Sequence, residues 1–365
     1  MNDNMRHLPT RLDQIDADWL TWALRTRAPG VTCRAAEIVD VIPGTCTKIR
    51  LRLDMDEAGK VAGIPATMIL KGGFEAHSRA MYSVQLSEVR GYRDVFPVSP
   101  LRTPKCFFAD YDDEGEQGLI LMEDLVARGA EFCSALRPQS FDQIARRLDA
   151  LARYHAQTWE SPDIRPGGRF ADFDETEPAL RIYMDQYLAK PSEWQRFIAM
   201  PRGAATSVRF HDLDRMIAAF ERLVAYSRTL PHCVIHGDTH LGNLYVDPDG
   251  SPGFFDSLPG RAPGMKEVSY HMTGALDVAD RRAWDRALVQ HYLDQLRAHG
   301  IDAPGFDEAW EQYVAFLLDG YIIFLLNESF YQPEAVNTAY AVRFSNAMID
   351  HGTLDLLEAI ERRLG

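Results

Sequence analysis

The strongest constraint on the fold is a change in the spacing of apolar residues near residue 125. Before this point, short runs such as Lys48–Leu53 alternate between apolar and polar residues, and a period of two is typical of a half-buried strand. After Pro138, apolar residues recur every three or four positions, for example along residues 141–159, as in amphipathic helices. The sequence therefore predicts a small β-rich part followed by a larger helical part.

The first part is predicted to contain five strands and two helices. The first helix begins after Asp16, which acts as its N-cap, and buries Trp19, Leu20, Ala23 and Leu24. The predicted strands cover residues 38–42, 48–53, 66–71, 106–110 and 119–122, with a turn at residues 57–60 and the second helix at residues 78–95.

The second part is predicted to be helical, except for a short β excursion at residues 233–256. Its predicted helices, besides the one at 141–159, lie at residues 177–200, 211–229, 281–298, 306–328 and 335–362. The most apolar run, Tyr313–Leu326, is shorter than the ~20 residues that a bilayer needs, and it contains Asp319. We therefore expect a helix buried in the core. The fold class is α+β, with an N-terminal lobe at residues 1–125 and a helical lobe at residues 126–365.

Charge and cysteine usage exclude several classes of function. The chain carries 39 basic and 53 acidic side chains, a formal net charge of −14, which argues against binding to nucleic acid or to anionic lipid. Its five cysteines form no CxxC pair, and its N-terminal residues lack the apolar core of a signal peptide. The sequence predicts a cytoplasmic protein that acts on a small molecule and binds neither nucleic acid nor membrane.

The residues that carry chemistry concentrate between positions 232 and 256. Three short predicted strands, at residues 233–235, 244–246 and 253–255, surround the sequence HGDTHLGN at residues 236–243. The last two strands form a hairpin, which brings Asn243 at its start near Asp256 at its end, one loop after Asp238. Such a set suits phosphoryl transfer, because one carboxylate can take the proton of an acceptor hydroxyl, while a carboxamide and a second carboxylate hold Mg²⁺.

This stretch resembles the signature of aminoglycoside phosphotransferases and choline kinases, HGDxxxxN followed by an apolar residue and Asp. With the segment DADWLTWAL near the N-terminus, the chain looks most like bacterial relatives of ecdysteroid kinase-like proteins. The resemblance implies a bilobal protein-kinase-like fold, with ATP and Mg²⁺ as cofactors. It also implies that Asp238 is the catalytic base and that Asn243 and Asp256 are metal ligands.

The N-terminal lobe carries the further residues that this fold needs. Lys71 ends the third predicted strand, where a kinase places the lysine that holds the nucleotide phosphates. Glu88, in the helix that follows, is the predicted partner of Lys71, and Glu75 is an alternative.

Two further segments are predicted to contact the nucleotide. The turn PGTCT, with Gly44 and Thr45, is predicted to cover the phosphates, although it also suits a plain hairpin. The join between the lobes, at Glu123–Leu125, is predicted to offer backbone groups to the adenine.

The sequence departs from the family pattern at two positions. Ser257 and Leu258 follow Asp256 where many relatives carry Trp-Gln, and Glu267 stands where an Asp is common. Neither change removes a phosphate or metal ligand, but both concern the shape of the pocket beside the metal and any substrate inferred by analogy.

Several other residues are assigned structural roles. His155 is predicted to be a core histidine that bonds the catalytic loop, and His236 is predicted to brace that loop. His240 suits either the acceptor or solvent. Three aromatic residues are predicted to lie in the core: Tyr321, Phe324 and Phe330.

Three functions compete. The first is an ATP-dependent kinase that phosphorylates a hydroxyl of a small molecule. The second is a non-catalytic pseudokinase, which would have no need of the base Asp238. The third is a metal-dependent phosphoesterase, which requires more histidines and carboxylates on separate loops than the GD and GN elements at residues 237–243 provide.

The acceptor is the least constrained part of the prediction. Residues 165–215 mix acids with aromatics, which suits an amine-bearing acceptor, an apolar alcohol, or ordinary packing beneath a solvated face. The acids are Asp172, Asp174, Glu175, Glu177 and Asp185, and the aromatics are Phe170, Phe173, Tyr183, Tyr187 and Trp194. We expect a neutral or apolar hydroxyl compound rather than a polycationic antibiotic, because the aromatics outweigh any clear acidic cluster.

Overall fold

The computed structural model describes residues 7–175, 180 and 183–364, so Glu177 lies outside the described residues. The chain divides into two compact units. The first contains residues 1–131 together with Phe255–Leu258, and the second contains Phe132–Phe254 and the remainder from Pro259. The predicted division of function, at residues 1–125 and 126–365, stays a prediction.

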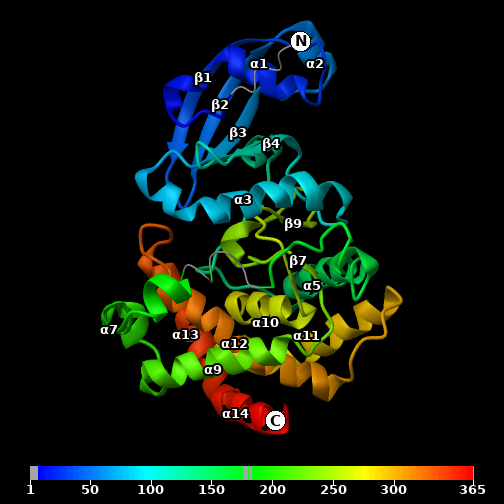
Figure 1. Cartoon of the computed structure of the whole chain (residues 1–365). Helices are drawn as coiled ribbons and strands as arrows, with labels where there is room; N and C mark the ends of the chain where they lie inside the picture. Colours follow the sequence, from blue (N-terminus) through cyan, green and yellow to red (C-terminus); the bar gives the residue numbers. More distant parts are fainter. Residues whose placement is uncertain (1–6, 176–179, 181–182, 365) are drawn as a thin grey trace. The chain divides into compact units, whose positions relative to one another are not determined.

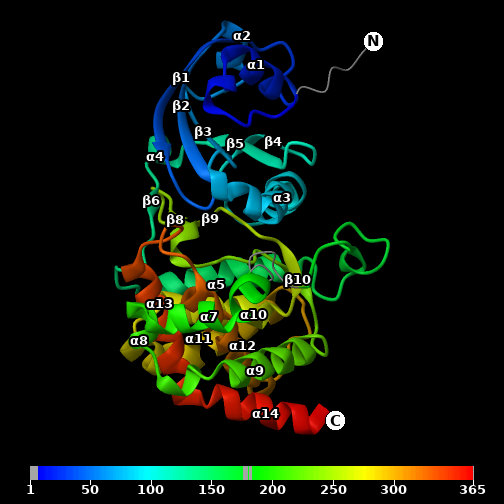
Figure 2. The same cartoon turned by 60° about the vertical axis from the view of Figure 1, so that its left-hand side comes forward.

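The first unit is built on an antiparallel sheet of five strands in the order β1-β2-β3-β5-β4 (Figures 1 and 2). Its helical elements are α1, which precedes the sheet, α2 after the second strand, α3 after the third, and α4 at the end. The strands are β1 (Cys33–Ile42), β2 (Thr47–Met55), β3 (Thr67–Gly72), β4 (Cys106–Asp112) and β5 (Gln117–Glu123), and the helices are α1 (Ala17–Arg25), α2 (Glu57–Val61), α3 (Tyr82–Arg90) and α4 (Leu125–Arg128). The prediction of five strands with a helix after the third is confirmed.

Local chemistry explains both the agreement and the differences. Asp16 caps α1 as predicted, because its carboxylate accepts a hydrogen bond from the backbone N–H of Trp19 at 2.7 Å. The predicted turn at residues 57–60 is wrong, since Asp56 caps Gly59 in the same way and starts the short helix α2. The predicted helix at residues 78–95 is a 3₁₀ turn, then α3, then a π-helical turn at Gly91–Val95.

One face of the sheet is packed against α1. Buried residues of this helix, including Trp19 and Leu24, share a core cluster with Ile49 and Leu51 of β2. The alternation predicted along β2 is confirmed, because its apolar residues are buried while Arg52 and Asp54 are exposed. The core therefore fixes the register that places Lys71 near the end of β3.

The second unit is mainly helical. Its helices are α5 (Phe141–Ala156), α7 (Pro191–Ala199), α8 (Pro201–Ala204), α9 (Leu213–Ser227), α10 (Gly264–Ala275), α11 (Val278–Ala298), α12 (Phe306–Leu326), α13 (Glu334–His351) and α14 (Thr353–Leu364). Its short strands are β7 (Cys233–Ile235), β8 (Leu244–Val246), β9 (Pro252–Phe254) and β10 (Gly260–Ala262), and β6 (Glu131–Phe132) lies where the chain leaves the first unit. Strands β8 and β9 form the predicted antiparallel hairpin, and β10 pairs with β7.

Helix α10 lies among α5, α12 and α13, and all twelve of its residues are buried (Figures 1 and 2). Helix α12 is long and apolar enough to cross a membrane by length and composition, yet 83% of its most apolar window is buried within the protein. The prediction of a core helix is therefore confirmed. The helix predicted at residues 335–362 is divided into α13 and α14 at Gly352, which has a left-handed φ of 66°.

The fold class is confirmed as α+β, with a small antiparallel sheet and a larger helical part. Tyr321 and Phe324 lie in the core as predicted. The prediction for Phe330 is wrong, because its side chain is 60% exposed. It lies in the turn between α12 and α13, where no helical period places a side chain inward.

Candidate active site

In the first unit, three predicted residues meet around one buried ammonium group. Lys71, in β3, forms an ion pair with Glu88 of α3, and its Nζ lies 2.8 Å from Oδ2 of Asp256. All three side chains are buried. The structure thus brings together Lys71, Glu88 and Asp256, and it joins Lys71 to Glu88 rather than to Glu75.

The charges in this group shift one another's proton affinities. Burial raises the pKa of Glu88 to about 8, with help from the nearby Asp256 carboxylate and against the pull of Lys71. Burial also acts to raise the pKa of Asp256, but Lys71 and then Lys48 outweigh it and hold that pKa at about 2. The two carboxylates raise the pKa of Lys71 although burial opposes them. Lys71 and Asp256 therefore remain charged at neutral pH.

Asp256 has an unusual backbone and an unsatisfied oxygen. Its φ is 56°, in the left-handed region that Asp tolerates better than most residues. Its Oδ2 faces Lys71 and lies 3.9 Å from Nζ of Lys48. Its Oδ1 is buried and has no hydrogen-bond partner among the described residues. A buried carboxylate oxygen without a donor fits a divalent cation, so the residues here suit Mg²⁺.

The described residues include no group of three or more His, Cys, Asp or Glu side chains that could hold a metal ion. A cation at Asp256 would then need further ligands from phosphate and water, which is how Mg²⁺ is commonly bound in nucleotide sites. Lys48 was not predicted as a site residue. It lies directly after the PGTCT turn. The only signal for it is its pairing with Lys71 across the β2–β3 ladder, which places both lysines on neighbouring strands.

The predicted nucleotide contacts on the backbone lie at the ends of strands. The carbonyl of Gly44 lies 2.9 Å from Nε2 of His77, and the carbonyl of Thr45 accepts a hydrogen bond from Ser78 at 3.4 Å. These bonds tie the β1–β2 turn to the segment before α3. Glu123 ends β5 and Leu125 begins α4.

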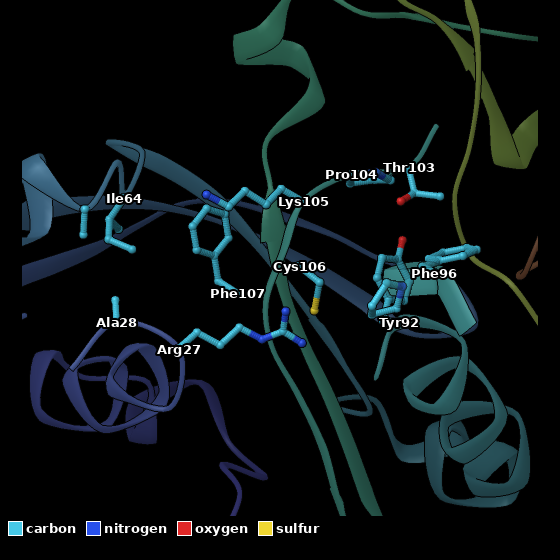
Figure 3. A pocket seen from close by; sticks show the side chains of 12 residues that line it. Arg27, Ala28, Ile64, Tyr92, Phe96, Thr103, Pro104, Lys105, Cys106 and Phe107 are labelled. Carbon is cyan, nitrogen blue, oxygen red and sulfur yellow. The ribbon is translucent and has the colours of Figure 1, made fainter. Parts of the chain in front are cut away.

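A cavity of about 290 Å³ opens on another part of the first unit (Figure 3). It is lined by the end of α1, the segment before β4 and the π-helical turn after α3, including Arg27, Lys105 and Tyr92. None of the predicted nucleotide residues lines this cavity. One lining residue, Tyr92, contacts Asp256, because its hydroxyl accepts a hydrogen bond from the Asp256 backbone N–H at 3.4 Å.

In the second unit, Asp238 and Asn243 lie together on the loop between β7 and β8. The amide Nδ2 of Asn243 donates to Oδ2 of Asp238 at 2.8 Å and to the Asp238 carbonyl at 3.1 Å. The other carboxylate oxygen, Oδ1, accepts a hydrogen bond from the hydroxyl of Tyr270 at 2.9 Å. Because Asn243 uses its N–H groups toward Asp238, its own carbonyl oxygen is the atom that suits a cation.

Beneath this loop, the buried Glu267 of α10 accepts three hydrogen bonds. The backbone N–H groups of His236 and Gly237 donate at 3.0 and 2.8 Å, and Nε2 of His155 lies at 2.8 Å. Burial tends to raise the pKa of Glu267, but the hydrogen bond and charge of His155, together with His236, outweigh burial and lower that pKa. Gly237 has a φ of 86°, which favours glycine at this turn. The longer side chain at position 267 therefore still anchors the loop.

The histidines of the loop have structural contacts. His155 reaches the loop through Glu267, and Nδ1 of His236 accepts from the Asp238 backbone N–H at 3.3 Å. His240 caps the 3₁₀ turn Leu241–Asn243 by accepting from Gly242, and its Nε2 lies 3.6 Å from Asp238.

Sequence reasoning missed helix α10 and, with it, Tyr270 and His271. His271 lies with its Nδ1 2.9 Å from the carbonyl oxygen of Thr239, in the same loop. A helix that is buried on every side shows no amphipathic period, so the sequence pattern does not reveal it. The available signal was the cluster of polar residues at 266–271, three of which contact the loop: Glu267, Tyr270 and His271.

Comparison with known proteins agrees with this arrangement. Residues 93–256 match the family model described as the phosphotransferase enzyme family, APH. The predicted resemblance is confirmed. The matched range contains Asp238, Asn243 and Asp256, and the match supports a small-molecule phosphotransferase. The likeness to ecdysteroid kinase-like proteins stays a prediction, and no curated protein matches the sequence.

Solved structures of kinases share the fold. The choline kinase LicA from Streptococcus pneumoniae superposes with a TM-score of 0.51 at 12% identity, covering 91% of this chain and 98% of that one. The choline kinase from Cryptosporidium parvum Iowa II gives 0.52 at 10% identity, covering 95% and 100%. LicA in complex with AMP gives 0.50 at 11% identity, covering 92% and 99%. At these identities the likeness shows the fold alone.

Proposed function

We propose that the chain is an ATP-dependent phosphotransferase that moves the γ-phosphate of ATP to a hydroxyl group of a small molecule. The observation that carries the proposal is the buried group of Lys71, Glu88 and Asp256. It offers an ammonium group for phosphate oxygens, together with a charged carboxylate whose Oδ1 has no donor among the described residues. Such a pair suits a polyanion that arrives with a divalent cation.

Each residue has a distinct part in the reaction. Asp238 takes the proton from the acceptor hydroxyl, whose oxygen forms the new bond to the γ-phosphorus. The bond from that phosphorus to the β–γ bridging oxygen breaks, and its electron pair stays on that oxygen, which leaves as part of ADP. Asn243 and Asp256 would hold Mg²⁺, which neutralises charge on the phosphates when bound. Lys71 contributes a second positive charge, and Glu88 keeps it oriented.

The nucleotide assignment extends to the backbone segments of the first unit. In the proposal, Gly44 and Thr45 cover the phosphates, and Glu123–Leu125 present backbone groups to the adenine. The complex of LicA with AMP supports a nucleotide in this fold. Residues 1–125 are proposed as the nucleotide-binding lobe and residues 126–365 as the catalytic and acceptor-binding lobe, acting in the cytoplasm.

For the acceptor, we propose a neutral or apolar hydroxyl compound. Most of the aromatics in residues 165–215 serve packing, since Phe170, Phe173 and Trp194 are buried. Tyr183 is buried as well, and its hydroxyl donates to Oδ1 of Asn327 at 2.9 Å. The described side chains around the Asp238 carboxylate are Asn243, Tyr270 and His240, none of them an acid that would attract a polycation.

A transfer assay tests the proposal. The purified chain is incubated with Mg²⁺ and γ-labelled ATP and a panel of alcohols, aminoglycosides and choline, beside the variant Asp238→Asn. We expect the wild type to transfer the label to an acceptor and the variant Asp238→Asn not to do so. Nucleotide binding without turnover in the wild type would indicate a pseudokinase. Hydrolysis of phosphate esters with Mn²⁺ and no nucleotide would indicate a phosphoesterase. Turnover with aminoglycosides alone would overturn the acceptor class.

A further inference from the structure

Tyr270 is the second residue that holds the carboxylate of Asp238. Its hydroxyl donates to Oδ1 at 2.9 Å, while Asn243 donates to Oδ2 at 2.8 Å. The two donors come from different elements, since Tyr270 lies in the buried helix α10 and Asn243 in the loop itself. Because both oxygens are engaged, the carboxylate cannot rotate without breaking a hydrogen bond.

The ring of Tyr270 is fixed by an aromatic column, which we define as Tyr270, Phe324 and Tyr340. Tyr270 stacks on Phe324 of α12 with ring centroids 5.4 Å apart and planes 14° apart. Phe324 stacks on Tyr340 of α13 at 4.0 Å and 21°. All three side chains are buried. Stacked rings in a packed core have few alternative rotamers, so the column sets the direction of the Tyr270 hydroxyl.

The other end of the aromatic column holds the same loop. The hydroxyl of Tyr340 accepts a hydrogen bond from the backbone N–H of Leu241 at 3.1 Å. His240 packs edge-on against both Phe324 and Tyr340, with ring centroids about 6 Å apart. The column therefore reaches the loop at the side chain of Asp238 and again three residues later.

Ordinary packing is the competing explanation, because buried tyrosines commonly find a partner for their hydroxyl. Tyr313 shows that case within the same unit, where its hydroxyl lies 3.0 Å from the side-chain oxygen of Thr273. Tyr270 differs because its partner is a partly exposed carboxylate with a proposed role in catalysis. Burial, with Asp238 as a smaller cause, raises the pKa of Tyr270 well above its ordinary value, so the hydroxyl remains a donor.

We propose that Tyr270 is a positioning residue, held by the aromatic column, that orients the carboxylate of Asp238 toward the acceptor hydroxyl. This inference rests on the proposed function, in which Asp238 is the base. Small displacements of a reacting group reduce rates strongly, and a misplacement of about 1 Å can cost on the order of 10²-fold. Removing one of the two donors should therefore lower turnover and leave nucleotide binding unchanged.

The test compares Tyr270→Phe with Tyr313→Phe, which removes a buried hydroxyl away from the loop. Because the natural acceptor is unknown, Mg-ATP hydrolysis with water as acceptor provides the rate, and binding of a fluorescent ATP analogue provides the nucleotide affinity. We expect Tyr270→Phe to reduce kcat by about 10- to 100-fold, with the KM for ATP unchanged. Tyr313→Phe should retain the wild-type kcat.

A second variant covers the case in which Tyr270→Phe is unstable. Phe324→Leu keeps the hydroxyl but loosens the aromatic column, and it should lower kcat by a smaller factor, again without raising the KM for ATP. Wild-type kcat in a folded Tyr270→Phe protein would overturn the inference, as would equal losses in Tyr270→Phe and Tyr313→Phe. If Asp238→Asn also retains turnover, the proposed function fails instead, so the two failures are distinguishable.

Discussion

Asp256 in the first unit and Asp238 in the second are both carboxylates, but their neighbours differ in charge. Asp256 faces the ammonium groups of Lys71 and Lys48, and its Oδ1 has no donor among the described residues. Asp238 receives hydrogen bonds from the neutral groups of Asn243 and Tyr270. A carboxylate among cations suits a metal ion and phosphates. A carboxylate that is held only by neutral donors has no cation to compete with a proton, so it suits a base.

The difference also separates the forces that matter in each unit. In the first unit, charges are buried together, so removing one of them leaves the others unpaired. In the second unit, the proposed role of Asp238 depends on the orientation of its carboxylate. The charged side chain that anchors its loop is the buried Glu267, which accepts hydrogen bonds from the loop backbone. Variants in the first unit should therefore change stability and nucleotide binding, and variants around Asp238 should change turnover.

The largest stability effect is expected from Lys71→Met. This change leaves the buried carboxylates of Glu88 and Asp256 without their shared cation, and it should lower the free energy of unfolding by about 3–5 kcal/mol. Urea unfolding measures the loss. The control is Lys48→Met, whose half-exposed ammonium lies 3.9 Å from Asp256 and should contribute about 1 kcal/mol or less. Equal losses in both variants would contradict a site organised around Lys71.

A smaller effect is expected from Glu267→Gln in the second unit. The amide retains one oxygen, and its NH₂ group replaces the other, so the backbone N–H of either His236 or Gly237 loses its acceptor. Losing one of these bonds in a buried site should lower the free energy of unfolding by about 1–3 kcal/mol. The matched variant Glu308→Gln, at an exposed position of α12, should leave it unchanged. An unchanged unfolding curve for Glu267→Gln would show that the loop has another anchor.

A further effect, which appears only as the pH falls, belongs to His271. Burial lowers its pKa from 6.5 to about 3, so the folded protein keeps this histidine neutral while the unfolded chain takes up a proton. Stability should therefore fall as the pH drops below 6.5, by at most about 1.4 kcal/mol for each pH unit.

His271→Gln keeps a donor for the Thr239 carbonyl without titrating, so it should flatten the pH dependence of stability between pH 6.5 and 4.5. Glu267 also loses stabilising energy as the pH falls, because its pKa is lowered in the folded protein, but this loss begins only below about pH 4.5. Urea midpoints across this range measure the effect, with the exposed His299→Gln as control. If His271→Gln leaves the slope of stability against pH unchanged, the acid sensitivity belongs to another group.

The sequence predicts two of the meetings in the candidate site. Asp238 and Asn243 lie five positions apart on one loop, so their spacing alone brings them close. The pairing of Lys71 with Glu88 follows from the order of elements that the kinase resemblance implies, a lysine on the third strand and a glutamate on the next helix. The role of each residue stays a proposal, but the juxtapositions were predictable.

The residues that sequence reasoning missed depend on long-range packing. Tyr270 reaches Asp238 from 32 positions away, on a helix without an amphipathic face. The positive φ of Asp256, and its Oδ1 without a partner among the described residues, depend on the structure around it rather than on a pattern in the sequence. Phe330, predicted to lie in the core, is exposed in the turn between α12 and α13.

The most direct test of the account measures Mg-ATP binding and turnover in two variants, Asp238→Asn and Asp256→Asn. The second change suits the left-handed backbone, because Asn also tolerates positive φ. We predict that Asp238→Asn binds Mg-ATP as the wild type does and loses about 10²- to 10⁴-fold in kcat, while Asp256→Asn loses both turnover and the Mg²⁺ dependence of nucleotide binding. Retained Mg²⁺ dependence in Asp256→Asn, or weakened binding in Asp238→Asn, would contradict the division of roles between the two carboxylates.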